Sequence, residues 1–284
     1  MKPGIYFLAV LLSITVTTHA QTVANDKTGK LFIIGGGDRP PALMKEMIRI
    51  ANLTPTEHIV VLPMSSAEPD SSYYYLVQDV APYCRNTIAN LNFTASTINN
   101  QVWLDSLRHA KLIFITGGDQ ERFMNAVLHT PVYEAIHFAY QNGSTVAGTS
   151  AGAAVMSRFM ITGRELKGDT TYHATFRKLQ DNNIEIKEGL GLLSTAIVDQ
   201  HFVVRSRYNR LLSALAKFPD LACIGIDEAT AIVVHKHHIA VAGEGQVLVF
   251  QDPQQLKITE NGLIKFKNLQ FSIFTAGDEF DLKK

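Results

Sequence analysis

Residues 144–156 read STVAGTSAGAAVM, a short apolar run that passes through two glycines into a series of small residues. The run STVA predicts a buried strand, and the alanine-rich continuation predicts a helix. A strand that turns directly into a helix is the repeating unit of a sheet with parallel strands. We therefore expect an α/β fold built on a mainly parallel sheet.

Short apolar runs and helix-period segments alternate on both sides of this segment. The expected strands are residues 31–34, 58–62, 111–116, 144–147, 195–198 and 222–226. The expected helices are residues 42–53, 120–129, 132–141 and 204–218. After Glu228, the run AIVVHKHHIAVAGEGQVLVF predicts additional antiparallel strands joined by turns. Residues 160–188 are expected to form the longest irregular insertion.

The first twenty residues, MKPGIYFLAVLLSITVTTHA, have the features of a cleavable secretory signal. A lysine lies near the start, an apolar run extends from Ile5 to Val16, and the small residue Ala20 ends the segment. The apolar run is short for a membrane span. We expect cleavage near Ala20, secretion to the periplasm or the medium, and no membrane association afterwards. An uncleaved anchor is the alternative.

Charge and cysteine content narrow the class of protein further. The 26 Lys and Arg residues balance 26 Asp and Glu residues, so there is no global basic field and we expect no nucleic-acid partner. Two cysteines cannot form a disulfide scaffold. Cys223 lies in the apolar run LACIGI and is expected to be a buried free thiol, with a single bridge to Cys84 as the alternative.

The five residues Gly148 to Gly152, GTSAG, match the G-x-S-x-G pattern of a nucleophile elbow. The strand before them and the helix after them make Ser150 project from the end of the sheet. There the backbone N–H groups and the positive end of the helix dipole favour a nucleophile and an oxyanion. The alternative is a small-residue packing turn with no chemical role.

A second glycine pair, Gly117 and Gly118, follows the strand at residues 111–116. Loops after parallel strands gather at one edge of the sheet, so this pair should lie close to Ser150. We expect Gly117 or Gly118 to supply one oxyanion donor and Ala151 the other. Phosphate binding is the alternative, also raised by GGGD at residues 35–38, although neither loop has a Walker or G-x-G-x-x-G pattern.

A nucleophilic serine needs a base, and the base needs an acceptor that orients it. His201 ends the run TAIVDQH and therefore lies at a strand end. The later run ACIGIDEA delivers Asp227 and Glu228 at the end of another strand. Metal binding is the other use of such a cluster, but the chain has no H-E-x-x-H and no paired-Cys pattern. We therefore expect no metal at this cluster.

The motifs GTSAGA, TGGDQ, DQHFVVRSRYNRLL and GIDEATA, taken together and in this order, resemble the cyanophycinase branch of the S51 serine peptidases. The aspartyl dipeptidases form another branch. The resemblance implies a glutamine-amidotransferase-like three-layer α/β sandwich and a Ser-His-Glu triad at Ser150, His201 and Glu228. It also implies that the enzyme needs neither a metal nor an organic cofactor. The sequence has no Pro/Gly/Ser-rich linker and no internal repeat, so we expect residues 21–284 to form a single catalytic domain.

The resemblance further implies a substrate site, because cyanophycin is a polyaspartate backbone carrying β-linked arginines. The implied substrate-binding residues are Gln120, Asp199, Gln200, Arg205, Arg207 and Arg210. Guanidinium forks suit carboxylates, and Asp199 could pair with a substrate guanidinium. An ordinary basic helix face is the alternative for the arginines, and at least one of the three is expected to be structural.

Together with the signal segment, the resemblance implies a secreted serine exopeptidase that hydrolyses cyanophycin to β-Asp-Arg dipeptides through an acyl-enzyme. The alternative enzyme is an aspartyl-dipeptidase-like hydrolase of other Asp or β-aspartyl peptides. A non-enzymatic binding protein of the same fold should have lost a triad member, and all three are present. The partner is then a peptide substrate, and the formation of a homodimer stays open.

Overall fold

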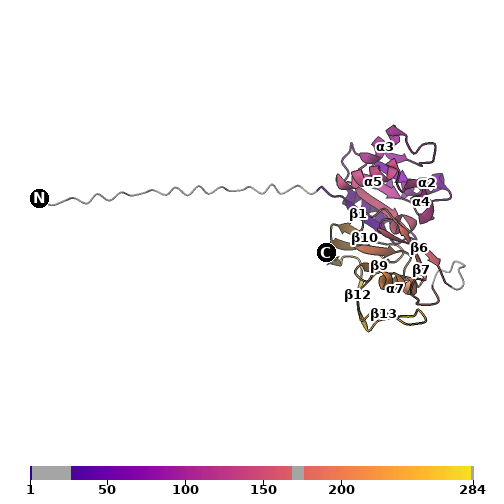
Figure 1. Ribbon diagram of the computed structural model, residues 1–284. Coiled ribbons are helices and arrows are strands. Elements are labelled where there is room, and N and C mark those ends of the chain that lie inside the picture. The colour runs from indigo at the N-terminus through magenta and orange to yellow at the C-terminus, as the bar shows by residue number, and fades with distance from the viewer. Residues whose placement is uncertain (2–26, 168–175, 283–284) are drawn as a thin grey trace.

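The computed structural model describes Met1, residues 27–167 and residues 176–282 (Figure 1). The expected signal segment therefore lies almost entirely outside the described residues. Within these ranges, no helix combines the length and the apolar character that crossing a membrane requires.

The main sheet has eight strands, in the order β16-β11-β10-β1-β5-β4-β2-β3. Five adjacent strands are parallel: β1 (Lys30–Ile34), β5 (Thr145–Thr149), β4 (Leu112–Ile115), β2 (Ile59–Leu62) and β3 (Ile88–Asn90). The antiparallel strands are β10 (Thr230–His235), β11 (His238–Gly243) and β16 (Glu279–Asp281). The expectation of a mainly parallel sheet extended by C-terminal antiparallel strands is confirmed.

Helices cover both faces of this sheet and make it the middle of three layers (Figure 1). The helices are α1 (Pro41–Ala51), α2 (Pro69–Val80), α3 (Gln101–Arg108), α4 (Gln120–Val127), α5 (Pro131–Gln141) and α6 (Ala151–Ala154). Side chains alternate along a strand, so Phe32 and Ile34 pack with α1 and α2 while Leu31 and Ile33 face α3 and α5. Both faces of β1 are therefore fully buried.

A second sheet has the order β15-β12-β9-β8 and packs against α7 (Tyr208–Lys217). Its strands are β8 (Ala196–Asp199), β9 (Ala222–Ile226), β12 (Val247–Gln254) and β15 (Asn268–Phe274). The strands expected at residues 195–198 and 222–226 thus exist, but they do not extend the main sheet. The reason is that β10 pairs directly with β1 and occupies the edge that β9 would need.

The interpretation of residues 160–188 as irregular is wrong at both ends. β6 (Phe159–Glu165) and β7 (Ile184–Glu188) form an antiparallel pair. The pairing register shifts between Ile161 and Glu165, and this irregularity hides the two-residue period in the sequence. A small hairpin of β13 (Lys257–Ile258) and β14 (Ile264–Lys265) completes the described strands. Helices α2 and α3 and strand β3 also lie where no element was expected.

Both cysteines are free thiols, as the apolar setting of Cys223 predicted. Burial raises the pKa of Cys223, and the neighbouring charge of Asp199 raises it further. The Cys223 thiol is therefore inert.

Candidate active site

Ser150 occupies a strained turn between β5 and α6. Its backbone has φ 53° and ψ −109°, a conformation that residues other than glycine rarely adopt. The Ser150 amide donates to the Ile34 carbonyl of the neighbouring strand at 3.1 Å, which holds the turn at the carboxyl end of the sheet. A side chain at Gly148 would overlap the Gly152 backbone, so the tight strand-to-helix turn requires glycine at position 148. This is the geometry of a nucleophile elbow.

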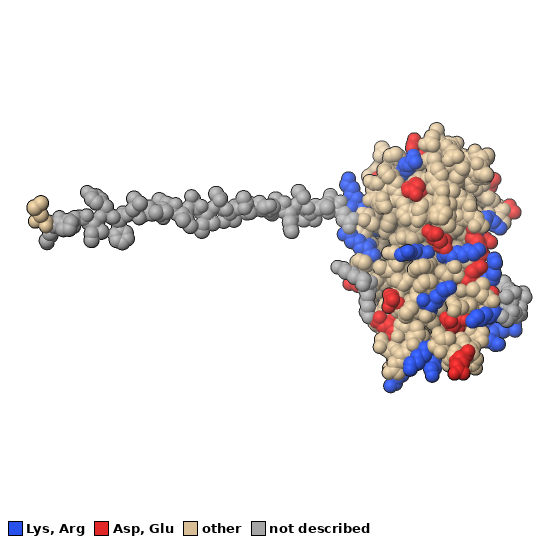
Figure 2. Space-filling view, viewed as in Figure 1, with Lys and Arg blue, Asp and Glu red and all other residues tan. Residues whose placement is uncertain are grey.

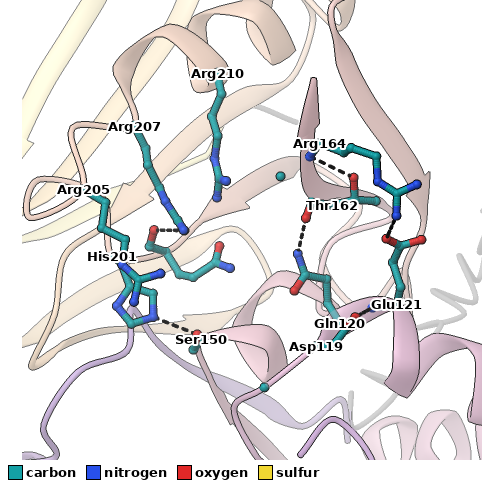
Figure 3. Close-up of a pocket in the computed structure, with 13 residues that line it drawn as sticks. Asp119, Gln120, Glu121, Ser150, Thr162, Arg164, His201, Arg205, Arg207 and Arg210 are labelled. Carbon is teal, nitrogen blue, oxygen red and sulfur yellow. Dashed lines mark hydrogen bonds and ion pairs between the residues drawn. The ribbon is translucent and has the colours of Figure 1, made fainter. Parts of the chain in front are cut away.

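His201 reaches Ser150 from the second sheet. It follows β8 in a left-handed conformation, with φ 49°, and its amide donates to the Gly35 carbonyl at 2.7 Å. His201 Nε2 lies 2.8 Å from Ser150 Oγ, the contact that Figure 3 draws as a dashed line. This is the distance at which the imidazole can take the hydroxyl proton.

Glu228 orients the imidazole from the other side. Its Oε1 lies 2.5 Å from His201 Nδ1, so Ser150, His201 and Glu228 form a continuous hydrogen-bonded chain. A carboxylate at Nδ1 places the proton there and leaves Nε2 as the acceptor. The neighbouring carboxylate of Asp227 holds the backbone after His201. Its Oδ1 accepts hydrogen bonds from the amides of Val203 and Val204 at 3.1 Å each.

The glycines after β1 pack directly against the side chains of His201 and Glu228. A side chain at Gly36 would overlap the His201 ring, and a Cβ at Gly37 would come within 2.7 Å of the Glu228 side chain. The Gly36 carbonyl also accepts the Ala229 amide at 2.9 Å. The GGGD segment thus supports the triad. Its position directly after the strand beside β5 was the signal that could have indicated this role.

We expect Gly36→Ala to reduce turnover by on the order of 100-fold, because the new Cβ displaces the imidazole by about an ångström. Gly277→Ala is the matched control: Gly277 also has a positive φ, of 92°, but no atom of the described residues lies within 4 Å of the Cβ that alanine adds. Both variants carry backbone strain, and only Gly36→Ala should lose activity. Steady-state kinetics measure the turnover of both variants, and thermal melts measure their stability. Equal losses of activity in the two variants would contradict a specific role for Gly36.

Burial lowers the pKa of His201 below its ordinary value of 6.5. The hydrogen bond to Glu228 acts in the opposite direction, while the positive charges of Arg205 and Arg207 lower the pKa further. The imidazole is therefore neutral at neutral pH, as a general base must be before it accepts a proton.

The three expected oxyanion donors surround Ser150. Ala151 is the first residue of α6 and is fully buried. A Cβ at Gly117 would lie 3.5 Å from the Ser150 Cβ, and Gly118 lines the same cavity as Ser150 and His201. The loop after β4 and the start of α6 thus meet at the nucleophile. Their roles as donors stay a prediction.

A cavity of about 390 Å³ opens beside Ser150. Basic and amide side chains dominate its lining, which comprises Gly118, Asp119, Gln120, Glu121, Ser150, Thr162, Gly163, Arg164, Gln200, His201, Arg205, Arg207 and Arg210. Lys and Arg side chains also gather in a band across the middle of the face in Figure 2, where β6 and β7 lie. In the close-up, Arg205, Arg207 and Arg210 face Gln120, Thr162 and Arg164 across the cavity (Figure 3).

Arg205, Arg207 and Arg210 do not lie together on one face of a helix. α7 begins at Tyr208, so Arg205 and Arg207 precede it in an irregular turn in which Ser206 has φ 48°. Arg207 donates to the Gln200 carbonyl at 2.6 Å. Arg210 lies on α7 itself, so the turn and the first part of the helix together bring the three arginines to the cavity.

Asp199 has a different role from the one expected. Its carboxylate is fully buried, with one oxygen 2.6 Å from Arg210 Nε and the other bonded to Arg210 Nη2. Arg207 Nη1 lies 3.5 Å from the same carboxylate. Asp199 therefore holds the chain's own arginines, and its carboxylate is not open to a substrate guanidinium. Arg210, which is 1% exposed, is the structural arginine that we expected among the three.

The two glutamines also divide their roles. Gln120 Nε2 donates to the carbonyls of Ile161 and Thr162 at 3.1 and 2.8 Å, which ties α4 to β6. Gln200 is 4% exposed, and among the described residues its Oε1 has no hydrogen-bond partner. Gln200 lines the cavity, while this oxygen itself is shielded from solvent.

The sequence was compared with known families and proteins. The model of peptidase family S51 matches residues 31–242, a range that includes Ser150, His201 and Glu228. The chain belongs to peptidase family S51. A cyanophycinase from Trichormus variabilis is 35% identical over 236 residues, covering 79% of this chain and 75% of that protein. A cyanophycinase from Synechococcus elongatus is 31% identical, covering 79% of this chain and 70% of that protein.

Solved structures share the fold. The structure of a peptidase from an acI-B1 Actinobacterium has a TM-score of 0.64 at 21% identity, covering 90% of this chain and 98% of that one. A putative Peptidase E protein from Listeria monocytogenes has a TM-score of 0.52 at 14% identity, covering 77% of this chain and all of that one. The chain is thus a cyanophycinase-like S51 peptidase with a mixed α/β fold.

Proposed function

We propose that residues 21–284 form a secreted serine exopeptidase that releases β-Asp-Arg dipeptides from cyanophycin through an acyl-enzyme. The hydrogen-bonded chain of Ser150, His201 and Glu228, opening into an arginine-lined cavity, carries this proposal. The similarity to cyanophycinases over most of the chain supports the choice of substrate.

In the proposed reaction, His201 Nε2 takes the Ser150 proton as Oγ attacks the amide carbon. The oxyanion that forms accepts hydrogen bonds from the amides of Ala151 and of Gly117 or Gly118. The C–N bond then breaks, and His201 returns the proton to the leaving nitrogen. Water, deprotonated by His201, attacks the ester carbon and frees Ser150.

The lining of the cavity suits both charged groups of the polymer. Arg205 presents a cation to the backbone carboxylates, and Arg207, which is 3% exposed, adds positive charge from the wall of the cavity. Gln200, which lines the same cavity, supplies the polar contact for a substrate guanidinium, in place of the occupied Asp199. The proposal thus assigns to Gln200 the task first expected of Asp199.

Substrate choice is tested by comparing kcat/KM for cyanophycin, for β-aspartyl dipeptides and for a panel of Asp-X dipeptides. We expect the polymer to be the best substrate. Faster cleavage of Asp-X dipeptides would instead identify an aspartyl-dipeptidase-like enzyme, with the same triad and a different substrate.

The proposal includes export of the chain and cleavage near Ala20. The lysine, apolar run and small residue at the start of the sequence support it. We expect N-terminal sequencing of the exported protein to begin at about Gln21. A full-length chain recovered in the membrane pellet, with Met1 intact, would contradict cleavage.

The lowered pKa of His201 predicts the acid limb of the pH profile. Protonated His201 cannot accept the Ser150 proton, so kcat/KM should fall with an apparent pKa below 6.5. Arg205→Gln removes a charge that lowers this pKa, so the limb should move to higher pH. Arg164→Gln is the control, because Arg164 lines the same cavity but pairs with Glu121. A limb that moves to lower pH in Arg205→Gln would refute the assignment.

A further inference from the structure

The turn that contains Gly117 and Gly118 is hydrogen-bonded to one buried serine, Ser65. Ser65 lies in the loop after β2, within the run LPMSS, and is completely buried. Its Oγ lies 2.6 Å from the Thr116 carbonyl oxygen and 3.2 Å from the Gly117 carbonyl oxygen. The Ser65 hydroxyl thus serves the two successive carbonyls that begin the turn.

The backbone of Ser65 holds the other end of the same turn. Its carbonyl oxygen accepts the Asp119 amide at 2.8 Å and Arg122 Nη1 at 3.0 Å. Gly118 passes so close that a side chain there would overlap this carbonyl, and its φ of 137° requires glycine. Ser65 therefore contacts the turn from Thr116 to Asp119 along its whole length.

These contacts fix the direction of two amides. In a trans peptide the C=O and N–H groups point in opposite directions, and the described residues contain no cis peptide. With the Thr116 and Gly117 carbonyls turned to Ser65, the N–H groups of Gly117 and Gly118 point away from it. Ser150 lies close to Gly117, and Gly118 lines the same cavity as Ser150 and His201.

We infer that Ser65 is a positioning residue, which keeps the Gly117–Gly118 amides directed at the oxyanion before substrate binds. The inference rests on the proposed serine mechanism. Glycine accepts either orientation of a peptide plane at low cost, so this turn has no intrinsic preference for the productive one. The Ser65 hydroxyl supplies that preference, because a rotated plane would remove its backbone acceptors and leave Oγ only the Thr116 hydroxyl, at 3.0 Å.

The test is the rate at which a fluorophosphonate labels Ser150, which requires no knowledge of the substrate. Ser150 Oγ forms a bond to phosphorus, the P–F bond breaks, fluoride leaves, and the serine proton passes to His201 Nε2. The phosphoryl oxygen needs the same donors as the oxyanion. Loss of one oxyanion donor costs about 100- to 1,000-fold, so Ser65→Ala, which only loosens the donors, should label about 10- to 100-fold more slowly. Its kcat should fall similarly, with KM little changed.

Ser144→Ala is the matched control. Ser144 is also buried, and its Oγ donates to the Ala110 carbonyl at 2.6 Å, but it precedes the opposite end of β5. Both variants lose the same kind of hydrogen bond, and only Ser65→Ala should label slowly. Ser65→Thr, which keeps the hydroxyl, should recover most of the rate. If Ser65→Ala does not fold, Ser65→Cys replaces it, because a thiol is a weak donor.

The labelling experiment distinguishes a failure of the role of Ser65 from a failure of the proposed serine mechanism. A folded Ser65→Ala, or its Cys substitute, that labels as fast as the wild type overturns the role of Ser65 and leaves the proposed function intact. A wild-type protein that is not labelled at Ser150 removes the proposed serine mechanism, and the role of Ser65 falls with it.

Discussion

Replacing Ser150 with alanine is expected to lower kcat by about 10⁴- to 10⁶-fold, as in other enzymes that lose a triad nucleophile. Alanine has no oxygen to form the acyl ester, while it fills the same space and keeps the same backbone strain. The thermal unfolding midpoint should therefore stay close to that of the wild type. Kinetics on cyanophycin, with circular dichroism melts of both proteins, measure the two effects.

Ser213→Ala is the control for this variant. Ser213 is buried on α7, where its Oγ donates to the Asn209 carbonyl at 2.8 Å. Its replacement should affect stability more than turnover. Appreciable peptidase activity in Ser150→Ala would rule out covalent chemistry at this serine.

Glu228→Gln is expected to reduce kcat by about 10⁴-fold, the loss seen when a triad carboxylate becomes an amide. The amide keeps the shape of the side chain, but it cannot stabilise the imidazolium that forms during attack. It can also present its NH₂ group to His201 Nδ1 and place the proton of the neutral ring on Nε2. That tautomer cannot accept the Ser150 proton.

Asp227→Asn provides a matched comparison at the adjacent position. The Asp227 carboxylate accepts from the Val203 and Val204 amides, and an asparagine oxygen can still accept both hydrogen bonds. We therefore expect Asp227→Asn to keep most of its turnover. Equal losses in the two variants would show that the local charge matters and that contact with His201 does not.

The triad could be predicted from sequence because each member follows a strand. Ser150 comes after β5, His201 after β8 and Glu228 after β9, and each strand is a buried run with clear ends. Strand ends, glycines and a following helix are local signals. They predicted the elbow, His201 and the pair Asp227 and Glu228 without knowledge of which strands are neighbours, and the resemblance to the S51 peptidases singled out Glu228 of the two.

The second sheet and the true role of Asp199 could not be predicted in this way. Whether β9 pairs with β12 or joins the main sheet depends on how β10 competes for the edge of β1. The pairing of Asp199 with Arg210 depends on a turn that bends residues 201–207 back over β8. The first depends on contacts between distant segments and the second on the path of an irregular turn, and neither produces a periodic pattern in the sequence.

The identity of the product tests the central claim most directly. Mature protein is incubated with insoluble cyanophycin, and the soluble products are identified by mass spectrometry over time, with Ser150→Ala in parallel. The account predicts β-Asp-Arg dipeptides from the first samples of the wild type and none from the variant. Polymer left intact by the folded wild-type protein, or dipeptides released equally by both proteins, would contradict it.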